Sequence, residues 1–145
     1  MSQLFSLTIR LPYLPPREFS GNFRGHWTAR YQAGEKVKND VIALVREQTA
    51  KSPCLKRAVV KIDWGLPDRR RRDRDNLLAA TKPMLDGLVA ANVIEDDSVR
   101  HINLRLSWFT SPRNPVCRIT VRESRVETFL AQPEKMDAIQ KILEG

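Results

Sequence analysis

The sequence has few of the residues that build disulfide-bonded or zinc-bound proteins. Its 145 residues include two cysteines, Cys54 and Cys117, and two histidines, His26 and His101. These are too few and too widely spaced for a disulfide framework or a zinc site, so both cysteines are expected to be reduced and structural. No apolar run approaches the ~18 residues of a membrane span. The first eleven residues lack the charged start of a secretory signal. A cytoplasmic protein with no membrane partner is therefore expected.

Basic residues outnumber acidic ones. Lysine and arginine together number 25 against 17 aspartates and glutamates, which gives a formal net charge of +8. This excess fits a polyanionic partner, but a basic balance alone does not identify nucleic acid. With 41% hydrophobic and 29% charged residues, the composition is that of a soluble globular protein. The length suits one domain of ordinary size.

Alternation of apolar and polar residues predicts four strands, at residues 5–11, 59–65, 101–108 and 117–122. The turn at residues 111–115 is short, so the last two strands are expected to form an antiparallel hairpin. Helical spacing predicts one helix from near Thr28 to Gln48. It predicts a second with an apolar face that contains Leu77, Leu78, Thr81, Leu85, Leu88 and Val89. Pro83 should either kink this second helix or start it again.

These elements predict an α+β fold, a two-layer α/β sandwich in which helices cover one face of a four-stranded mixed sheet. The other face would be polar. It is either a basic binding surface or a set of ordinary solvent-facing positions, and it would carry Arg10, Lys61, Arg105, Arg118 and Arg122. Residues 1–123 form the predicted domain. Residues 124–145 form a C-terminal extension with a short amphipathic helix over residues 133–143.

The segment PDRRRRDRD, residues 67–75, suggests both a metal and a polyanion. In an extended backbone, Asp73 and Asp75 would point to the same side and could hold one Mg2+ ion. The neighbouring arginines would bring phosphates to that ion; they are Arg69, Arg70, Arg71, Arg72 and Arg74. Two other interpretations stay open. Asp75 can be the N-cap of the following helix, and an arginine run can be a solvated face or a targeting patch.

A second basic segment, SGNFRGHWTARY at residues 20–31, interleaves Arg24 and Arg30 with aromatic residues. Such a mixture suits phosphate contacts combined with base stacking. The alternative is that Trp27 and Tyr31 pack onto the core and only the arginines reach solvent. This alternative is the one we favour for the aromatic residues.

Three segments form a specific combination: PDRRRRDRDNL at 67–77, KPMLDGL at 82–88 and EDDSV at 95–99. The combination resembles the RusA family of Holliday junction resolvases, which are small homodimeric Mg2+-dependent nucleases of bacteria and their phages. With weaker similarity elsewhere, the resemblance spans about residues 4–123. It implies that Asp73, Asp75 and Asp97 bind the metal and that Lys82 is the catalytic lysine. The family pattern favours Asp97 over its neighbour Asp96.

The chain departs from the family pattern in the second helix. In most relatives the lysine follows the DN pair by three residues, whereas here that position is Ala79 and the first lysine is Lys82. An insertion of three residues is close to one helical turn of 3.6 residues. Lys82 therefore stays on nearly the same face of the helix.

The resemblance implies an Mg2+-dependent, structure-specific endodeoxyribonuclease, with Mn2+ as a substitute metal, that acts as a homodimer on four-way DNA. Two sites related by twofold symmetry would make paired nicks that leave 5′-phosphates and resolve the junction in DNA recombination and repair. The expected setting is a bacterial cell, with a bacterial, phage or prophage gene. Two alternatives remain: a general nuclease for branched DNA, and a non-catalytic DNA-binding protein.

Overall fold

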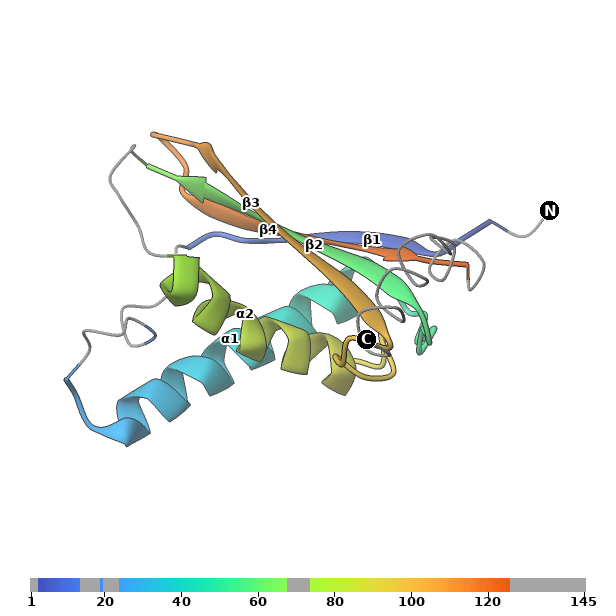
Figure 1. Cartoon of the computed structure of the whole chain (residues 1–145), viewed down its shortest axis with the longest axis horizontal. Coiled ribbons are helices and arrows are strands. Elements are labelled where there is room, and N and C mark those ends of the chain that lie inside the picture. The colour runs from blue at the N-terminus through green and yellow to red at the C-terminus, as the bar shows by residue number, and fades with distance from the viewer. Residues whose placement is uncertain (1–2, 14–18, 20–23, 68–73, 126–145) are drawn as a thin grey trace, which may run out of the picture.

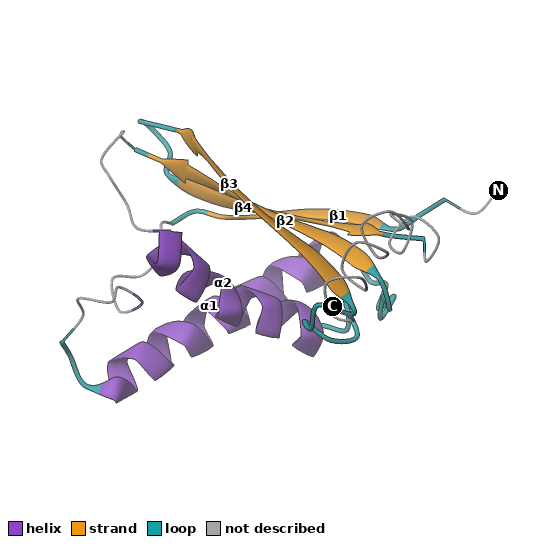
Figure 2. Ribbon diagram, viewed as in Figure 1, coloured by secondary structure: helices purple, strands orange, loops and turns teal. Residues whose placement is uncertain are grey.

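The helices and strands form two layers, with both helices on one face of a four-stranded sheet (Figures 1 and 2). The computed structural model describes residues 3–13, 19, 24–67 and 74–125, without the side chains of residues 74–76. The elements are β1 (Ser6–Leu11), α1 (Trp27–Gln48), β2 (Ala58–Leu66), α2 (Arg74–Ala90), β3 (Ile102–Thr110) and β4 (Val116–Glu123). The predicted α+β sandwich is confirmed. The predicted helix over residues 133–143 lies outside the described residues.

The sheet has the strand order β1-β4-β2-β3. β2 pairs in parallel with β3 on one side and antiparallel with β4 on the other, and β1 pairs antiparallel with β4. The sequence of β2 explains its central place, because five consecutive residues from Ile62 to Leu66 are buried. β1 alternates buried and exposed residues instead, as an edge strand with one covered face does.

The predicted hairpin of the last two strands is wrong. β2 lies between β3 and β4 and pairs with both, so residues 111–115 cross over the end of β2. The Ser111 N–H donates a hydrogen bond to the Leu66 carbonyl at 2.6 Å and fixes this crossing. Strands on either side of a central strand are about 10 Å apart, and an extended residue spans about 3.3 Å. Five residues are therefore long enough to pass over one strand, and a short connection does not require pairing.

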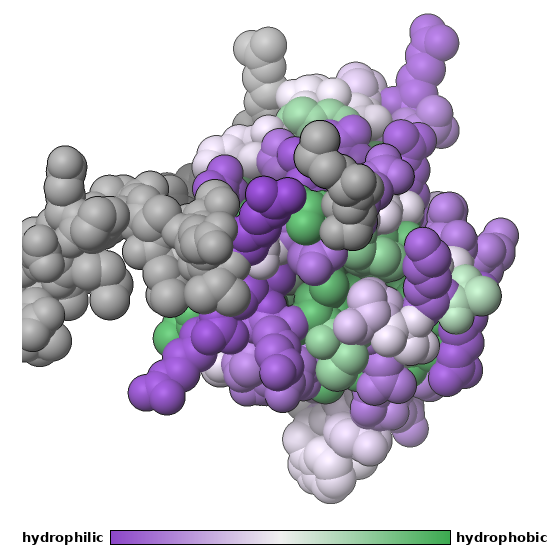
Figure 3. Space-filling model, turned by 90° about the vertical axis from the view of Figure 1, so that its right-hand side faces the viewer, coloured by the Kyte–Doolittle hydropathy of each residue, from purple (hydrophilic) through white to green (hydrophobic). Residues whose placement is uncertain are grey.

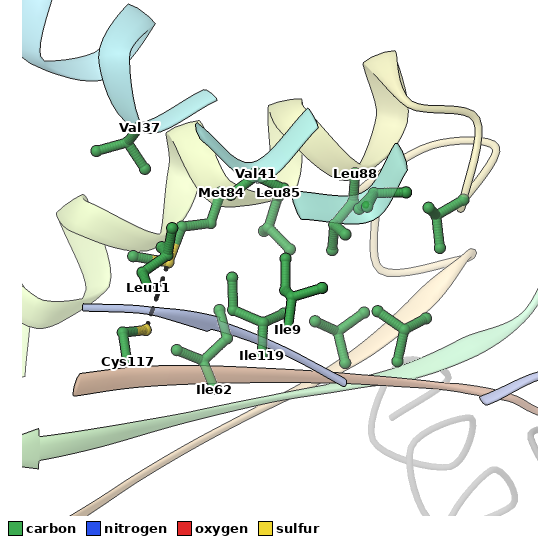
Figure 4. Close-up of a cluster of buried hydrophobic side chains, with 14 of the residues drawn as sticks. Ile9, Leu11, Val37, Val41, Ile62, Met84, Leu85, Leu88, Cys117 and Ile119 are labelled. Carbon is green, nitrogen blue, oxygen red and sulfur yellow. Dashed lines mark hydrogen bonds between the residues drawn. The ribbon is translucent and has the colours of Figure 1, made fainter. Parts of the chain in front are cut away.

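The core lies between the sheet and the helices (Figure 4). Val37, Val41 and Val45 follow one another every four residues, so they form one buried stripe along α1. Cys117 is buried, and its sulfur lies 3.9 Å from that of Met84 on α2. Burial raises the pKa of the Cys117 thiol far above its ordinary value, so this thiol stays protonated. Both cysteines are free, Cys117 buried in the core and Cys54 exposed.

Four large apolar residues are exposed, and three of them, Trp27, Tyr31 and Leu78, were expected on the core. Trp27 is 71% and Tyr31 63% exposed, because the first turns of α1 extend beyond the sheet and the first buried residue of α1 is Val37 (Figure 1). Trp108 shares a row of the sheet with buried Trp64 but is 61% exposed, since β3 is an edge strand whose end rises away from the helices. Leu78 is 47% exposed on the outer side of α2.

Helix α2 does not start again at Pro83. It continues from Arg74 to Ala90 with the proline inside it, although a proline removes one hydrogen bond of the helix. The Thr81 hydroxyl donates to the Leu78 carbonyl at 2.6 Å, so this turn gains a side-chain bond. Helix α2 therefore presents one continuous face over its 17 residues.

The surface is largely hydrophilic in the end view of Figure 3, where apolar side chains show in gaps between polar ones. In the part of the chain that the structure describes, no helix combines the length and the apolarity that a membrane crossing requires.

Candidate active site

Lys82 lies on the exposed side of α2 between two carboxylates. Its ammonium nitrogen is 2.5 Å from Asp97 Oδ2 and 3.0 Å from Asp86 Oδ1. Asp86 is one turn further along the same helix, whereas Asp97 comes from the loop between α2 and β3. The Lys82 side chain is 64% exposed, so the group is open to a ligand from solvent. Lys82 and Asp97, which are fifteen positions apart in the sequence, are thus in contact on the surface.

The loop that carries Asp97 begins at a well-defined helix end. Asn92 has a φ of 59°, a left-handed conformation that asparagine adopts more readily than most residues. The Asn92 N–H donates to the Val89 carbonyl and the Val93 N–H donates to the Leu88 carbonyl, each at 3.0 Å. These two bonds form a Schellman motif, which ends α2 and turns the chain back.

Cys54 and Leu55, in the segment before β2, form backbone hydrogen bonds with the next residues of this loop. Three backbone bonds join the two segments: Cys54 N–H to the Asn92 carbonyl (2.8 Å), Leu55 N–H to the Val93 carbonyl (2.9 Å) and Glu95 N–H to the Leu55 carbonyl (3.0 Å). Val93 and Ile94 are buried in the core. The acidic pair follows directly after Glu95. Asp97 is therefore presented from a fixed point of the fold.

The two carboxylates affect the charge of Lys82 in the same direction. The hydrogen bond to Asp97, and after it the bond to Asp86, raises the pKa of Lys82 above its ordinary value. The ammonium group consequently stays protonated throughout the neutral and mildly basic range. This part of the site offers one permanent positive charge beside two carboxylate groups.

The structure describes some of the predicted site residues and not others. Lys82 contacts Asp97. Asp96, the residue before Asp97, is exposed. Asp73 lies outside the described residues, as do residues 69–72. Arg74 and Asp75 are the first two residues of α2, so the interpretation of Asp75 as an N-cap is wrong and its backbone is helical rather than extended. Positions 75 and 82 are seven residues apart, close to two helical turns, and so lie on one side of α2.

Sequence reasoning missed Asp86 as a member of this group. Its signal was present, because lysine and aspartate four residues apart on a helix are neighbours, and KPMLDGL contains this spacing. Among the side chains that the structure describes, no three histidines, cysteines, aspartates or glutamates are grouped to hold a metal. Two of the three predicted ligands, Asp73 and Asp75, are outside that set.

The basic and aromatic segment before α1 is exposed. Arg24 precedes the helix, and Arg30 lies in its first two turns, both on the surface. The His26 ring caps α1 by accepting a hydrogen bond from the Thr28 N–H at 3.2 Å. That ring also lies against Trp27, with 5.6 Å between ring centroids. Aromatic rings and arginines thus share this surface, an arrangement that suits base stacking.

Comparison with known proteins identifies the family. No family model matches the chain. The chain is 34% identical over 87 residues to the crossover junction endodeoxyribonuclease RusA of Enterobacteria phage HK97, a match that covers 60% of this chain and 70% of the phage protein. This chain belongs to the RusA family. The chain is also 32% identical over 114 residues to an uncharacterized protein of Xylella fastidiosa (strain Temecula1), a match that covers 70% of this chain and 72% of that protein.

Proposed function

We propose that this RusA-family chain is a structure-specific endodeoxyribonuclease that resolves Holliday junctions with Mg2+ as its cofactor. The observation that carries the proposal is the identity of 34% to a crossover junction endodeoxyribonuclease, over 70% of that protein. The contact between Lys82 and Asp97 supports it. Cleavage of a phosphodiester builds negative charge on phosphate oxygens, and a fixed cation near carboxylates is suited to that reaction.

Asp73, Asp75 and Asp97 would hold the metal. Mg2+ takes carboxylate oxygens and retains several waters. Asp97 can offer such an ion an oxygen ligand, because its carboxylate is partly exposed to solvent. A metal bound there would share this carboxylate with the ammonium of Lys82, which is bonded to Oδ2. When bound, the metal supplies charge neutralisation at the phosphate and a bound water of lowered pKa. Mn2+ prefers the same oxygen ligands and would substitute for it.

Lys82 would act as the positive charge nearest to the reacting phosphate. An ammonium group is a compact point charge on a flexible stem, so it can follow a phosphate oxygen as charge develops there. The raised pKa keeps this charge in place at neutral pH. Asp86 gives the ammonium a second partner on its own helix, which keeps the lysine oriented independently of Asp97.

The remaining parts of the proposal concern DNA and symmetry. Residues 69–72 with Arg74, and Arg24 and Arg30, would contact DNA phosphates, because arginine binds phosphate oxygens through paired N–H groups. A Holliday junction is approximately twofold symmetric, whereas one chain supplies one site. A C2 homodimer would place two identical sites on strands of like polarity and so make paired nicks.

A cleavage assay on matched substrates tests the proposal. The substrates are a synthetic four-way junction and a linear duplex that contains one of the same strands, each incubated with Mg2+, Mn2+ or EDTA. We expect paired symmetric nicks with 5′-phosphate ends in the junction, only with a divalent metal, and little cleavage of the duplex. Sedimentation of the free protein should show a dimer.

Other results would replace this proposal. Equal cleavage of junction and duplex by a monomer would indicate a general nuclease. Junction binding without cleavage in either metal would indicate a DNA-binding protein without catalysis.

A further inference from the structure

The sheet has one face that α1 and α2 do not cover, which we call the open face (Figure 2). Strand pairing aligns its side chains in rows across all four strands. One row is Ser6, Arg122, Val59 and Asn103; the next is Thr8, Thr120, Lys61 and Arg105; the third is Arg10, Arg118, Asp63 and Ser107. Successive rows are two residues apart along each strand, or about 7 Å. The five basic residues predicted for this face therefore do share it.

The charge of these rows is almost entirely positive. Arg10, Arg105 and Arg122 are exposed, and the side chains of Lys61 and Arg118 are 53% and 40% exposed. Asp63 is the one acidic residue in the three rows, and only 3% of its surface is exposed. Solvent therefore meets the basic groups of this face and almost none of its acid.

Asp63 has a structural task in this surface. Its carboxylate accepts hydrogen bonds from the Ser107 hydroxyl and from Nε and Nη2 of Arg118, the latter two at 3.3 and 3.2 Å. The guanidinium of Arg118 also lies over the ring of Phe109, 5.6 Å from its centroid. Arg118 is thus held flat near the sheet. The Lys61 ammonium is also 3.9 Å from the Asp63 carboxylate, but its side chain is 53% exposed. Arg10, Arg105 and Arg122 are exposed to a partner that approaches from solvent.

The positive charge of the open face determines which kind of partner can bind there. Two open faces would repel each other, because each has five basic residues against one buried acid, so a second copy of this chain does not fit there. A polyanion fits, since each basic group can neutralise a phosphate. Neutral donors lie between the charges, at Ser6, Thr8, Thr120 and Asn103, and hydroxyl and amide groups commonly bond phosphate oxygens.

We propose that the open face binds the sugar-phosphate backbone of one duplex arm of a branched DNA substrate. This inference rests on the proposed function. Lys82 is on the helix layer, whereas the open face is on the other side of the sheet. A straight duplex held at Lys82 would continue past the sheet, but an arm that leaves a junction at an angle can turn around its edge. The open face would therefore contribute to binding of branched DNA more than of linear DNA.

The test compares two triple variants with the same change in charge. The first is Arg10→Gln/Arg105→Gln/Arg122→Gln on the open face. The control is Arg46→Gln/Lys51→Gln/Lys56→Gln, whose exposed side chains lie outside the three rows. Affinity for a fluorescent four-way junction and for a linear duplex is measured in EDTA over a range of salt concentrations, so that binding is read without cleavage.

We expect the open-face variant to lose junction affinity about tenfold or more relative to the control, and the slope of log K against log salt to fall by about 2.7, or 0.9 for each lost phosphate contact. The loss for linear duplex should be smaller. A charge-preserving variant, Arg10→Lys/Arg105→Lys/Arg122→Lys, should keep the slope and guards against a folding defect.

Two results would overturn the inference. One is junction affinity and slope equal to those of the control variant, and the other is an equal loss for junction and duplex. Failure of the proposed function would be recognised separately, because the wild-type protein would then bind without metal-dependent junction cleavage.

Discussion

Helices α1 and α2 are in tight contact at Gly87, where an added side chain has no room. A Cβ atom added at Gly87 would lie 2.8 Å from Cβ of Val41 and 2.9 Å from the backbone carbonyl oxygen of Lys38. A carbonyl oxygen in a helix cannot rotate away as a side chain can. Gly87→Ala therefore forces α1 and α2 apart, which should also displace Lys82 and Asp86 on the same helix.

The magnitude follows from two opposing effects. Overpacking a core costs about 1–3 kcal/mol, whereas alanine stabilises a helix interior over glycine by about 0.5–1 kcal/mol. The net loss should be about 1–2 kcal/mol, and Tm should fall by about 3–6 °C for a chain of this size. Gly34→Ala is the matched control. A Cβ there meets Phe19 at 3.7 Å and Pro83 at 3.9 Å, ordinary contact distances, so only the helix gain of about 0.5–1 kcal/mol remains.

Thermal and urea unfolding of the two variants and the wild type would measure this difference. We expect opposite signs, with Gly34→Ala more stable and Gly87→Ala less stable than the wild type. If Gly87→Ala were as stable as Gly34→Ala, the helices would not be in contact at Gly87, and the reasoning would be refuted.

Three further predictions concern charged residues. Lys82→Ala should lower the cleavage rate on the order of 100-fold, while Lys36→Ala, which removes a similarly exposed lysine paired with an aspartate four residues on, should change it little; a loss of only a few-fold for Lys82→Ala would assign the role to another base. Asp75→Asn should abolish cleavage but keep or tighten junction binding, because the amide lacks the charge that holds Mg2+; cleavage near the wild-type rate would remove Asp75 from the site. Asp63→Asn should destabilise the fold by about 1–3 kcal/mol, less than for a fully buried pair because the Arg118 side chain is 40% exposed; an unchanged urea midpoint would contradict this.

The layers of the fold were predictable because burial on one face leaves a clear period in the sequence. The alternation of β1 and β4 separates their core residues from the residues on the open face. Pairing partners were not predictable in the same way. A strand pattern reports which face is covered, and it does not report which neighbour supplies the backbone hydrogen bonds. The connection from β3 to β4 was therefore misread as a hairpin.

The exposure of apolar side chains at the ends of helices and strands could not be predicted from the sequence either. Trp27, Tyr31 and Trp108 are apolar residues at positions where a helix or strand extends past its partner layer. The sequence shows that these side chains are apolar, but it does not show where the opposite layer stops.

The candidate site shows the same division between local and distant information. Lys82 and Asp97 came from the family resemblance, and the structure brings these two together. Asp86 needed only the rule for helix neighbours four residues apart, yet that rule carries weight only when the helix is known to continue through Pro83. Asp63 lies on the open face, two residues from Lys61. Its burial depends on Ser107 and Arg118 from two other strands, which no local pattern reveals.

The pairing of β1 with β4 also sets the order in which this chain can fold. Ser6 pairs with Arg122 and Leu11 with Cys117, so the first strand to leave a ribosome finds its backbone partner in the last strand described. Contacts so distant in sequence form late, because their loop-closure entropy has to be overcome first. Until β4 is made, β1 has no backbone partner and the antiparallel side of β2 is unpaired. A nascent chain stopped before residue 116 would thus expose two strand edges, and it should be more prone to aggregation than the completed protein.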